Sequence, residues 1–161
     1  MAFKNEGSIG KIEIVNYSEE LKESVKTLNV EWLEKYFKVE PIDVIQLSHP
    51  TREIINKGGM IFYAKYNSVI VGTASLLKID EKTFELGKMA VTESAQGFGI
   101  GKALMDHCFK IAAKNNIQKL VLYSNTKLSS AIHIYKKYGF TEIILESGHY
   151  ERANIKMEKT I

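Results

Sequence analysis

The stretch Gln96-Gly97-Phe98-Gly99-Ile100-Gly101-Lys102 lies between an apolar run over 83–91 and a segment over 99–115 whose apolar residues recur at helical spacing. A helix N-terminus leaves backbone N–H groups unpaired and carries partial positive charge. Glycines remove the Cβ atoms that would keep an anion away from those groups, and Lys102 adds a charge. The stretch therefore predicts a phosphate-binding loop, although tight packing of a strand on a helix would use the same glycines.

Two other kinds of phosphate loop do not fit this stretch. A Walker loop needs a glycine five residues before its Gly-Lys pair and Ser or Thr after the lysine, where Gln96 and Ala103 stand. The dinucleotide fingerprint needs a third glycine at 102 or 104, where Lys102 and Leu104 stand. A nucleotide-binding protein of unrelated fold is therefore the most remote interpretation.

Outward from the loop, the spacing of apolar residues predicts alternating strands and helices. Asn67-Ser68 between two apolar runs indicates a hairpin, and Ser18 is placed to cap a helix. The expected strands span 10–17, 60–66, 69–77, 83–91, 119–123, 140–145 and 155–157, and the expected helices 18–37, 99–115 and 128–138, with a short helix or two in 42–57. With no linker or repeat, we expect one α/β (α+β) domain over 1–161, its core at 10–159, with a mixed, mostly antiparallel, twisted sheet flanked by helices.

The composition is that of an ordinary globular protein. A formal net charge of +3 with scattered lysines shows no basic stripe, so we expect no nucleic-acid partner. Cys108 is the only cysteine, which excludes an intramolecular disulfide and favours a reducing compartment. The N-terminus lacks the apolar core of a signal peptide, and no apolar run reaches the roughly 18–20 residues that span a bilayer. We therefore expect a cytoplasmic protein with no membrane partner, and the histidine spacing predicts no metal site.

Three further features accompany the loop in chain order. The preceding strand, 85–91, contains Gly87, which predicts a bulge or a close backbone approach. A later strand ends in Ser124-Asn125, and residues 131–140 read Ala-x-x-x-Tyr-x-x-x-Gly-Phe. Together with Gln-x-x-Gly-x-Gly at 96–101, these features resemble the GNAT N-acetyltransferase superfamily, whose members have the acyl-CoA N-acyltransferase fold. The motifs cover 84–140, and the rest of the chain is compatible with that fold.

The resemblance implies that acetyl-CoA is the co-substrate and that acetyl passes directly to a primary amine of a small molecule or a protein. It implies no metal, and homodimers are common among such proteins. Asn125 stands three residues further from the tyrosine than in the commonest spacing, where Leu128 stands. The residues that the resemblance assigns to coenzyme A are Met89, Ala90, Val91, Gln96, Gly97, Phe98, Gly99, Ile100, Gly101, Lys102 and Asn125.

The resemblance also implies two catalytic groups. Tyr135 matches the family's general acid, because a phenol keeps its proton at neutral pH and can give it to a departing thiolate. The alternative is a tyrosine packed between helix and strand, with its hydroxyl bonded to a backbone carbonyl. Glu85 is the first candidate for the base, because strand alternation puts it on the same face as Met89 unless a bulge intervenes. The other interpretation of Glu85 is a carboxylate at the edge of the sheet that faces solvent or pairs with a lysine. The weaker candidates for the base are Glu31, Glu34, Tyr123 and His133.

The acceptor site has less support in the sequence. Trp32 and Tyr36 are four residues apart on the first helix, which forms one wall of the acceptor site in the resembling fold. Arg152, in a polar and aromatic stretch over 148–154, is a candidate for holding a substrate carboxylate. The alternative to an N-acetyltransferase is a non-catalytic module of the same fold that binds acyl-CoA.

Overall fold

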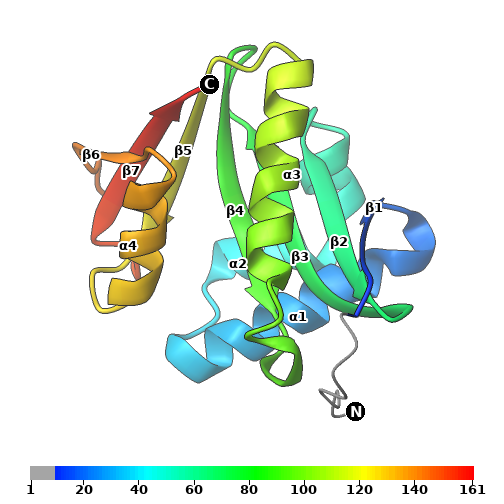
Figure 1. Cartoon of the computed structure of the whole chain (residues 1–161). Helices are drawn as coiled ribbons and strands as arrows, with labels where there is room; N and C mark the ends of the chain where they lie inside the picture. Colours follow the sequence, from blue (N-terminus) through cyan, green and yellow to red (C-terminus); the bar gives the residue numbers. More distant parts are fainter. Residues whose placement is uncertain (1–9) are drawn as a thin grey trace.

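The computed structural model describes residues 10–161. The first nine residues of the expected domain, and most of the N-terminus expected to lack a signal peptide, lie outside this range. Seven strands form one sheet in the order β1-β2-β3-β4-β5-β7-β6 (Figure 1). The strands are β1 (Ile12–Asn16), β2 (Met60–Tyr66), β3 (Val69–Lys78), β4 (Thr83–Val91), β5 (Lys119–Ser124), β6 (Thr141–Ile143) and β7 (Ile155–Thr160).

The pairing of β4 with β5 determines where this sheet opens. These two strands run parallel, whereas the other neighbours in the described sheet are antiparallel. Their ladder joins only Thr83–Glu85 to Lys119–Val121, although both strands continue further. Beyond Glu85 the two strands therefore diverge, as Figure 1 shows. The predicted mixed, mostly antiparallel sheet flanked by helices is confirmed.

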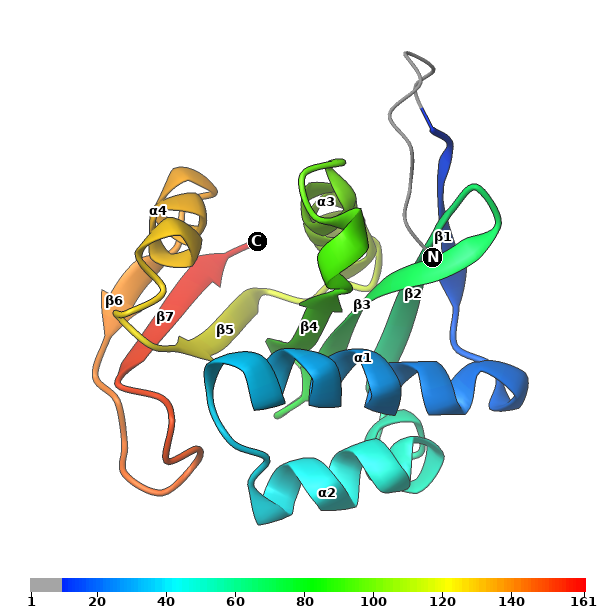
Figure 2. The same ribbon diagram turned by 90° about the horizontal axis from the view of Figure 1, so that it is seen from below.

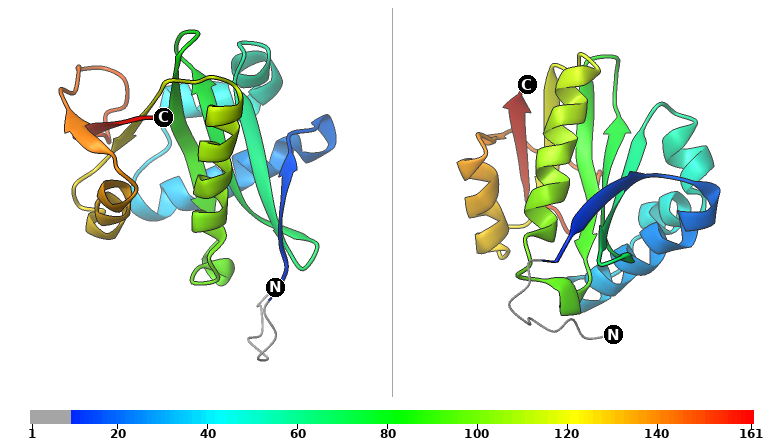
Figure 3. Two further views of the ribbon diagram at one scale, coloured as in Figure 1. Left: turned by 45° about the horizontal axis from the view of Figure 1, so that its top comes forward. Right: turned by 45° about the vertical axis from the view of Figure 1, so that its right-hand side comes forward.

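The helices cover both faces of the sheet. Helices α1 (Lys22–Tyr36) and α2 (Pro41–Ser48) lie on one face, and α3 (Ile100–Lys114) and α4 (Ser129–Lys137) on the other (Figures 2 and 3). Each face has its own hydrophobic cluster, to which the helices on that face contribute apolar side chains. Within residues 10–161, none of these helices is both long enough and apolar enough to cross a membrane.

The first helix begins later than the sequence predicts. Ser18 opens a 3-10 turn over Glu19–Leu21, and α1 follows at Lys22. The Ser18 side chain makes no capping hydrogen bond, so the predicted side-chain cap is wrong. The Leu21 N–H instead donates to the Ser18 carbonyl at 3.0 Å, which satisfies the turn through the backbone.

The last two strands also differ in length from the prediction. β6 has three residues where 140–145 was expected, because Phe140 turns into the core and Ile144 lies 89% exposed beyond the last paired residue. β7 has six residues where three were expected, because it pairs with β5 on one side and β6 on the other. At its polar end, Lys159 and Thr160 pair with β5 alone, and that ladder keeps them in strand conformation.

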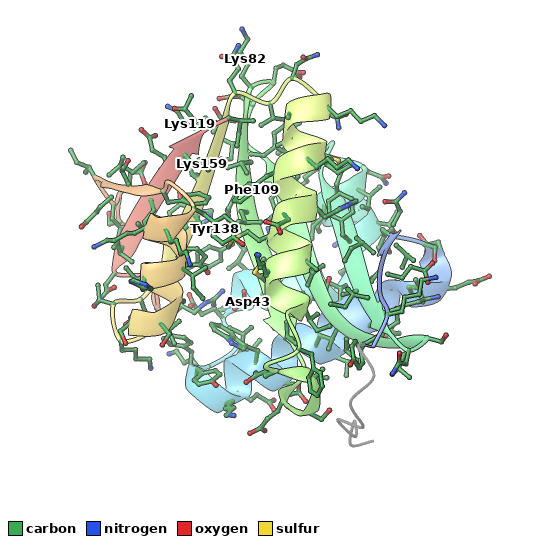
Figure 4. All side chains as sticks on the ribbon, viewed as in Figure 1. Asp43, Lys82, Phe109, Lys119, Tyr138 and Lys159 are labelled. Carbon is green, nitrogen blue, oxygen red and sulfur yellow. The ribbon has the colours of Figure 1, made fainter. Side chains whose placement is uncertain are left out.

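Helix α3 packs closely on the sheet because β3 offers it a glycine. A Cβ at Gly72 would lie 2.9 Å from Cγ2 of Ile100 and 3.1 Å from Cδ1 of Leu104. On the other side of α3, the Phe109 ring lies 5.5 Å from the ring of Tyr138, which follows α4 (Figure 4). The position of the α3 N-terminus thus depends on close contact with β3.

We expect Gly72→Ala to lower the free energy of unfolding by about 1–3 kcal/mol, because its Cβ overpacks the contact with Ile100 and Leu104. Urea denaturation measures this change. Gly101→Ala is the matched control, because a Cβ there meets nothing within 4 Å and alanine favours helix. Equal stability of the Gly72→Ala variant and the wild type would contradict the close contact.

Candidate active site

One cavity of about 550 Å³ occupies the space between the diverging strands β4 and β5. Its walls come from both faces of the sheet, because α1 and α2 contribute residues from one side and α3 and α4 from the other. It brings together segments that are far apart in the sequence. The residues lining it include thirteen of the predicted site residues: Trp32, Glu85, Met89, Ala90, Val91, Gln96, Gly97, Gly99, Ile100, Gly101, Asn125, Tyr135 and Arg152.

A β-bulge shapes the β4 wall of this cavity. The ladder with β3 shifts by one residue between Gly87 and Ala90, and Lys88 has a left-handed backbone with φ of +48°. The sequence placed the irregularity at Gly87, whereas the left-handed residue is Lys88. Gly87 provides the close approach instead, because a Cβ there would lie 2.8 Å from Oε2 of Glu85.

The bulge reverses the side-chain alternation of β4. Before it, Phe84 and Leu86 pack into the cluster under α3, and after it Met89 and Val91 do so. Glu85 and Met89 therefore point to opposite faces, so the same-face arrangement that alternation predicted is wrong. Asn29 on α1 holds the bulge, since its side-chain amide donates to the Lys88 carbonyl at 3.2 Å.

The glycine loop ends in a helix N-terminus that faces the cavity. Gly97 and Gly99 have φ of +87° and +81°, a backbone conformation that favours glycine. Within the described residues no side chain caps α3, and a Cβ at either glycine would meet nothing within 4 Å. Gly101 is helical and equally open, so the fold itself gives no packing reason for a glycine there. An anion that approaches the backbone would supply that reason, so the residues present fit a pyrophosphate.

Two residues that the sequence assigned to this loop point elsewhere. The Phe98 ring packs 5.2 Å from the ring of Tyr66, and Phe98 does not line the cavity. Lys102 is exposed on α3 and does not line it either. Gln96 does line it, and its side-chain amide donates to the Val91 carbonyl at 3.3 Å.

Asn125 joins the end of β5 to the loop before β7. Its amide donates to the Arg152 carbonyl at 2.8 Å, and its side-chain oxygen accepts the Lys127 N–H at 2.9 Å. Both polar groups of this side chain thus have partners within the protein. A contact between Asn125 and coenzyme A stays a prediction.

Tyr135 lies on α4 and lines the cavity from the α3 side of the sheet. Its ring packs edge-on against Phe140, with 6.0 Å between centroids. Within residues 10–161, no protein group hydrogen-bonds its hydroxyl, which differs from the packed tyrosine bound to a carbonyl. Burial raises the pKa of Tyr135, so the hydroxyl keeps its proton at neutral pH.

Glu85 faces the cavity from the other side of the sheet and is 5% exposed. Its Oε1 lies 3.0 Å from Nε2 of His149, and the Tyr150 hydroxyl donates to Oε2 at 3.0 Å. Burial first, and then the charge of Glu85, raise the pKa of Tyr150 far above its ordinary value. The Tyr150 hydroxyl therefore acts as a fixed hydrogen-bond donor to the carboxylate.

A buried ionic network lies beside Glu85. Asp43, with no exposed surface, accepts hydrogen bonds from Nζ of Lys88 at 2.8 Å and from Nη1 and Nη2 of Arg152 at 2.7 and 3.0 Å. Burial alone would raise the pKa of Asp43, but the Arg152 hydrogen bonds and the charge of Lys88 outweigh it and lower this pKa to about 2. Burial lowers the pKa of Lys88, and the charge of Asp43 opposes that shift.

Arg152 already holds carboxylates of its own chain. Besides its two bonds to Asp43, Nη1 donates to Glu40 at 2.9 Å. Glu40 also accepts the backbone N–H groups of Glu151 and Arg152, at 2.7 and 3.3 Å. These bonds fasten the loop before β7 to the start of α2. The role of Arg152 toward a substrate carboxylate stays a prediction.

An aromatic wall closes the cavity at the end of α1. Trp32 and Phe37 line it, with 5.6 Å between their rings. Tyr36 does not line the cavity but packs against Trp32 at 5.4 Å. Lys127 crosses from the β5–α4 loop, donating to the Tyr36 carbonyl at 2.8 Å with Nζ 3.9 Å from the Phe37 ring centroid.

Comparison with known proteins identifies the family. The family model described as acetyltransferase (GNAT) family matches residues 22–140. The chain belongs to the GNAT acetyltransferase family. A GNAT-family acetyltransferase structure from Staphylococcus aureus Mu50 has a TM-score of 0.83 and 26% identity, over 93% of this chain and 99% of that one. The PaiA N-acetyltransferase of Thermoplasma acidophilum, solved in complex with coenzyme A, shares the fold with a TM-score of 0.71 and 22% identity, over 94% and 99% of the two chains.

Curated relatives are similar over part of their length. Probable N-acetyltransferase family 8 member 5 of Mus musculus is 28% identical over 110 residues, which is 65% of this chain and 47% of that protein. Probable N-acetyltransferase san of Drosophila melanogaster is 25% identical over 105 residues, or 62% and 56% of the two. The chain thus spans about half the length of the curated relatives it matches.

Among the weaker candidates for the base in this GNAT protein, Tyr123 alone lines the cavity, within the part of the chain described. Glu31 accepts a hydrogen bond from the Thr92 hydroxyl at 3.0 Å, outside the cavity. Glu34 and His133 are exposed on α1 and α4. Of the carboxylates that the sequence predicted as the base, Glu85 is thus the one that lines the cavity.

Sequence reasoning missed several residues that line this cavity. Asn29, Asp43, Lys88 and Tyr150 line the cavity. Tyr150 lies in the polar stretch over 148–154 that the sequence singled out, so its composition was the available signal. No sequence signal distinguished Asp43, because a carboxylate early in a helix is typical of capping. Asp43 does accept the Glu40 N–H at 2.9 Å.

The depressed pKa of Asp43 predicts a pH dependence of stability. A carboxyl whose pKa falls from 3.8 to about 2 on folding stabilises the protein above pH 4, and that contribution disappears as the pH falls toward 2. We expect it to amount to about 2 kcal/mol. Urea denaturation at pH 7, 4 and 2.5 should show this loss in the wild type.

The Asp43→Asn variant should lose about 3–5 kcal/mol at neutral pH, because it leaves Lys88 buried without a carboxylate and Arg152 with Glu40 alone. Its stability should then fall less between pH 4 and 2.5 than that of the wild type. Glu81→Gln is the control, since Glu81 is an exposed partner of Lys78. Equal pH slopes for the wild type and Asp43→Asn would contradict this interpretation.

Proposed function

We propose that this protein is an acetyl-CoA-dependent N-acetyltransferase that acetylates a primary amine. The observation that carries the proposal is the continuity of one cavity from the glycine loop to Tyr135 and Glu85. The loop supplies N–H groups for a pyrophosphate at one end, and the other end is lined by aromatic and acidic groups. Family membership supports acetyl transfer as the reaction class.

The glycine loop and the part of β4 that does not pair with β5 would hold acetyl-CoA. Bound there, acetyl-CoA supplies an acetyl group activated as a thioester. The unpaired N–H groups at the start of α3 suit its pyrophosphate, and the backbone of Met89–Val91, free of β5, has groups available for the pantetheine arm and the acetyl carbonyl. A backbone N–H at a developing oxyanion is typically worth about 2.7–4 kcal/mol.

Tyr135 and Glu85 divide the acid and base roles between the two faces of the sheet. Glu85 would accept protons from the amine on the side of α1, and Tyr135 would donate to the leaving sulfur on the side of α4. This separation suits a direct transfer, because the amine attacks from one side while the thiolate departs toward the other. The raised pKa of Tyr135 keeps the acid protonated through the neutral range.

If the glycine loop binds the pyrophosphate, a substitution there should affect stability and coenzyme A affinity differently. Gly101→Ala should leave the free energy of unfolding unchanged or higher, since its Cβ meets nothing in the protein. The same Cβ should weaken coenzyme A binding by roughly 10-fold, because it holds the pyrophosphate away from the N–H groups. Calorimetric titration with coenzyme A measures this. Unchanged affinity would contradict the proposal that the glycine loop binds the pyrophosphate.

Release of free coenzyme A thiol from acetyl-CoA, followed across amines, polyamines, amino acids and peptides, tests the function itself. With an accepted amine, Tyr135→Phe should lower kcat by ~10²-fold and leave coenzyme A affinity unchanged. An unchanged kcat would reduce Tyr135 to a packing residue. Tight acetyl-CoA binding without turnover of any amine would favour the non-catalytic acyl-CoA-binding module.

A further inference from the structure

The charged side chains that line the cavity pair with one another, with one exception. Within residues 10–161 they are Asp43, Glu85, Lys88 and Arg152. Lys88 bonds Asp43 at 2.8 Å. Arg152 bonds Asp43 and also Glu40, which does not line the cavity. Two cations thus match two carboxylates, and Glu85 is the charged group that remains.

The Glu85 carboxylate is buried without a lysine or arginine as ion-pair partner in the described part of the chain, and its side chain is 6% exposed. The charge of Glu85 acts on Lys88, whose hydrogen bond nevertheless goes to Asp43. His149 and Tyr150 each contact one oxygen of Glu85 at 3.0 Å. These two contacts use about half of the roughly four acceptor positions of a carboxylate. A cation in the cavity would stabilise such a buried carboxylate.

The same pairing leaves no free cation for a carboxylate of the acceptor, among the residues described. Both terminal nitrogens of Arg152 donate to Asp43, and Nη1 also donates to Glu40. Lys127 does not line the cavity, and its Nζ lies 3.9 Å from the Phe37 ring centroid. A carboxylate on the acceptor would therefore lose its hydration or displace a carboxylate of the chain. A second ammonium meets the same difficulty, because Asp43 is already bonded by two cations.

Apolar and aromatic side chains line the cavity near these charged groups. Trp32 and Leu33 share a face of α1 with Asn29, whose amide bonds the carbonyl of the β4 bulge. Phe37 extends this wall, with its ring 5.6 Å from that of Trp32, and Tyr123 lines the cavity from β5. Aromatic rings of this kind bury an uncharged aromatic group well and also favour a nearby ammonium.

We propose that the acceptor is a monoamine with an uncharged aromatic body, an inference that rests on the proposed function. Its ammonium binds the Glu85 carboxylate, and its body lies against Trp32 and Phe37. An amine that adds a carboxylate, as an amino acid does, or a second ammonium, as a diamine does, finds no free partner of opposite charge. Binding of the ammonium precedes the proton removal already proposed for Glu85 and adds no chemical step.

Two matched pairs of amines test the charge requirement. Phenylalanine differs from phenethylamine by one carboxylate, and cadaverine differs from pentylamine by one additional ammonium. Release of coenzyme A thiol should give each simple amine a kcat/KM ~100-fold or more above that of its partner, because the added charge is desolvated without a counterion. Phenylalanine accepted as well as phenethylamine would show that Arg152 is available to a substrate carboxylate, and the inference would be wrong. Equal values for cadaverine and pentylamine would contradict it as well.

Binding to the protein in the presence of coenzyme A, where no transfer can occur, tests the role of Glu85 separately. At about pH 8 a free imidazole is uncharged, whereas an alkylammonium is charged. By calorimetric titration, Glu85→Gln should weaken phenethylamine binding by ~10-fold or more and change the affinity for phenethyl alcohol by less than about 2-fold. Glu81→Gln is the matched control, because it makes the same change at an exposed position and should leave both affinities unchanged. Equal effects of Glu85→Gln on the amine and the alcohol would overturn the inference.

The contact with the aromatic body is tested at Trp32. Trp32→Leu keeps an apolar side chain but removes the ring, so the ratio of kcat/KM for phenethylamine to that for ethylamine should fall by ~10-fold. Trp32→Phe should retain most of the ratio. Comparing two substrates in one variant separates this contact from a loss of folded protein. A ratio that stays the same in Trp32→Leu would contradict an aromatic body at this wall.

Failure of the proposed function would give a different result. If the wild type acetylated no amine but bound phenethylamine through Glu85, the proposed function would fail while the ligand class remained correct. If the wild type acetylated the simple amines and their charged partners equally well, the inferred acceptor class alone would be wrong.

Discussion

Strands β4 and β5 pair over only three residues each, and the candidate site depends on their separation. A continuous ladder would consume the backbone groups of Met89–Val91 and leave no passage between the two faces of the sheet. The bulge at Lys88 bends β4 away and reverses its alternation. The Asn29 side chain on α1 donates a hydrogen bond to the Lys88 carbonyl in this bulge. One local irregularity thereby opens the cavity and puts Glu85 on the face opposite Tyr135.

The fold keeps charged groups buried at this opening because they satisfy one another. Asp43 lies between Lys88 and Arg152, and Arg152 also bonds Glu40. An unpaired charge there would be strongly unfavourable, whereas a network in which each group has partners is tolerated. This network also links α2, the bulge and the loop before β7. It therefore fixes the part of the cavity that Asp43, Lys88 and Arg152 line.

The periodic elements and the glycine loop could be predicted because their signals are local. Apolar spacing identified the strands and the α3 stripe, and the loop glycines at 97 and 99 have the positive φ values that favour glycine. Phe98 and Lys102 show the limit of that reasoning. Being adjacent to the loop glycines in the chain does not place them on the cavity, since Phe98 packs on Tyr66 and Lys102 is exposed on α3.

By itself, the sequence determined the fold class and the position of the glycine loop, because helix and strand periodicity and glycine conformation are properties of neighbouring residues. Tertiary structure alone decided the part of the cavity that Asp43, Lys88 and Tyr150 line. Asp43, Lys88 and Tyr150 are separated by dozens of residues and meet only when α2, β4 and the last loop pack together. Whether Glu85 and Met89 share a face depended on a bulge held by a distant asparagine, and long-range contacts of this kind leave no periodic trace in the chain.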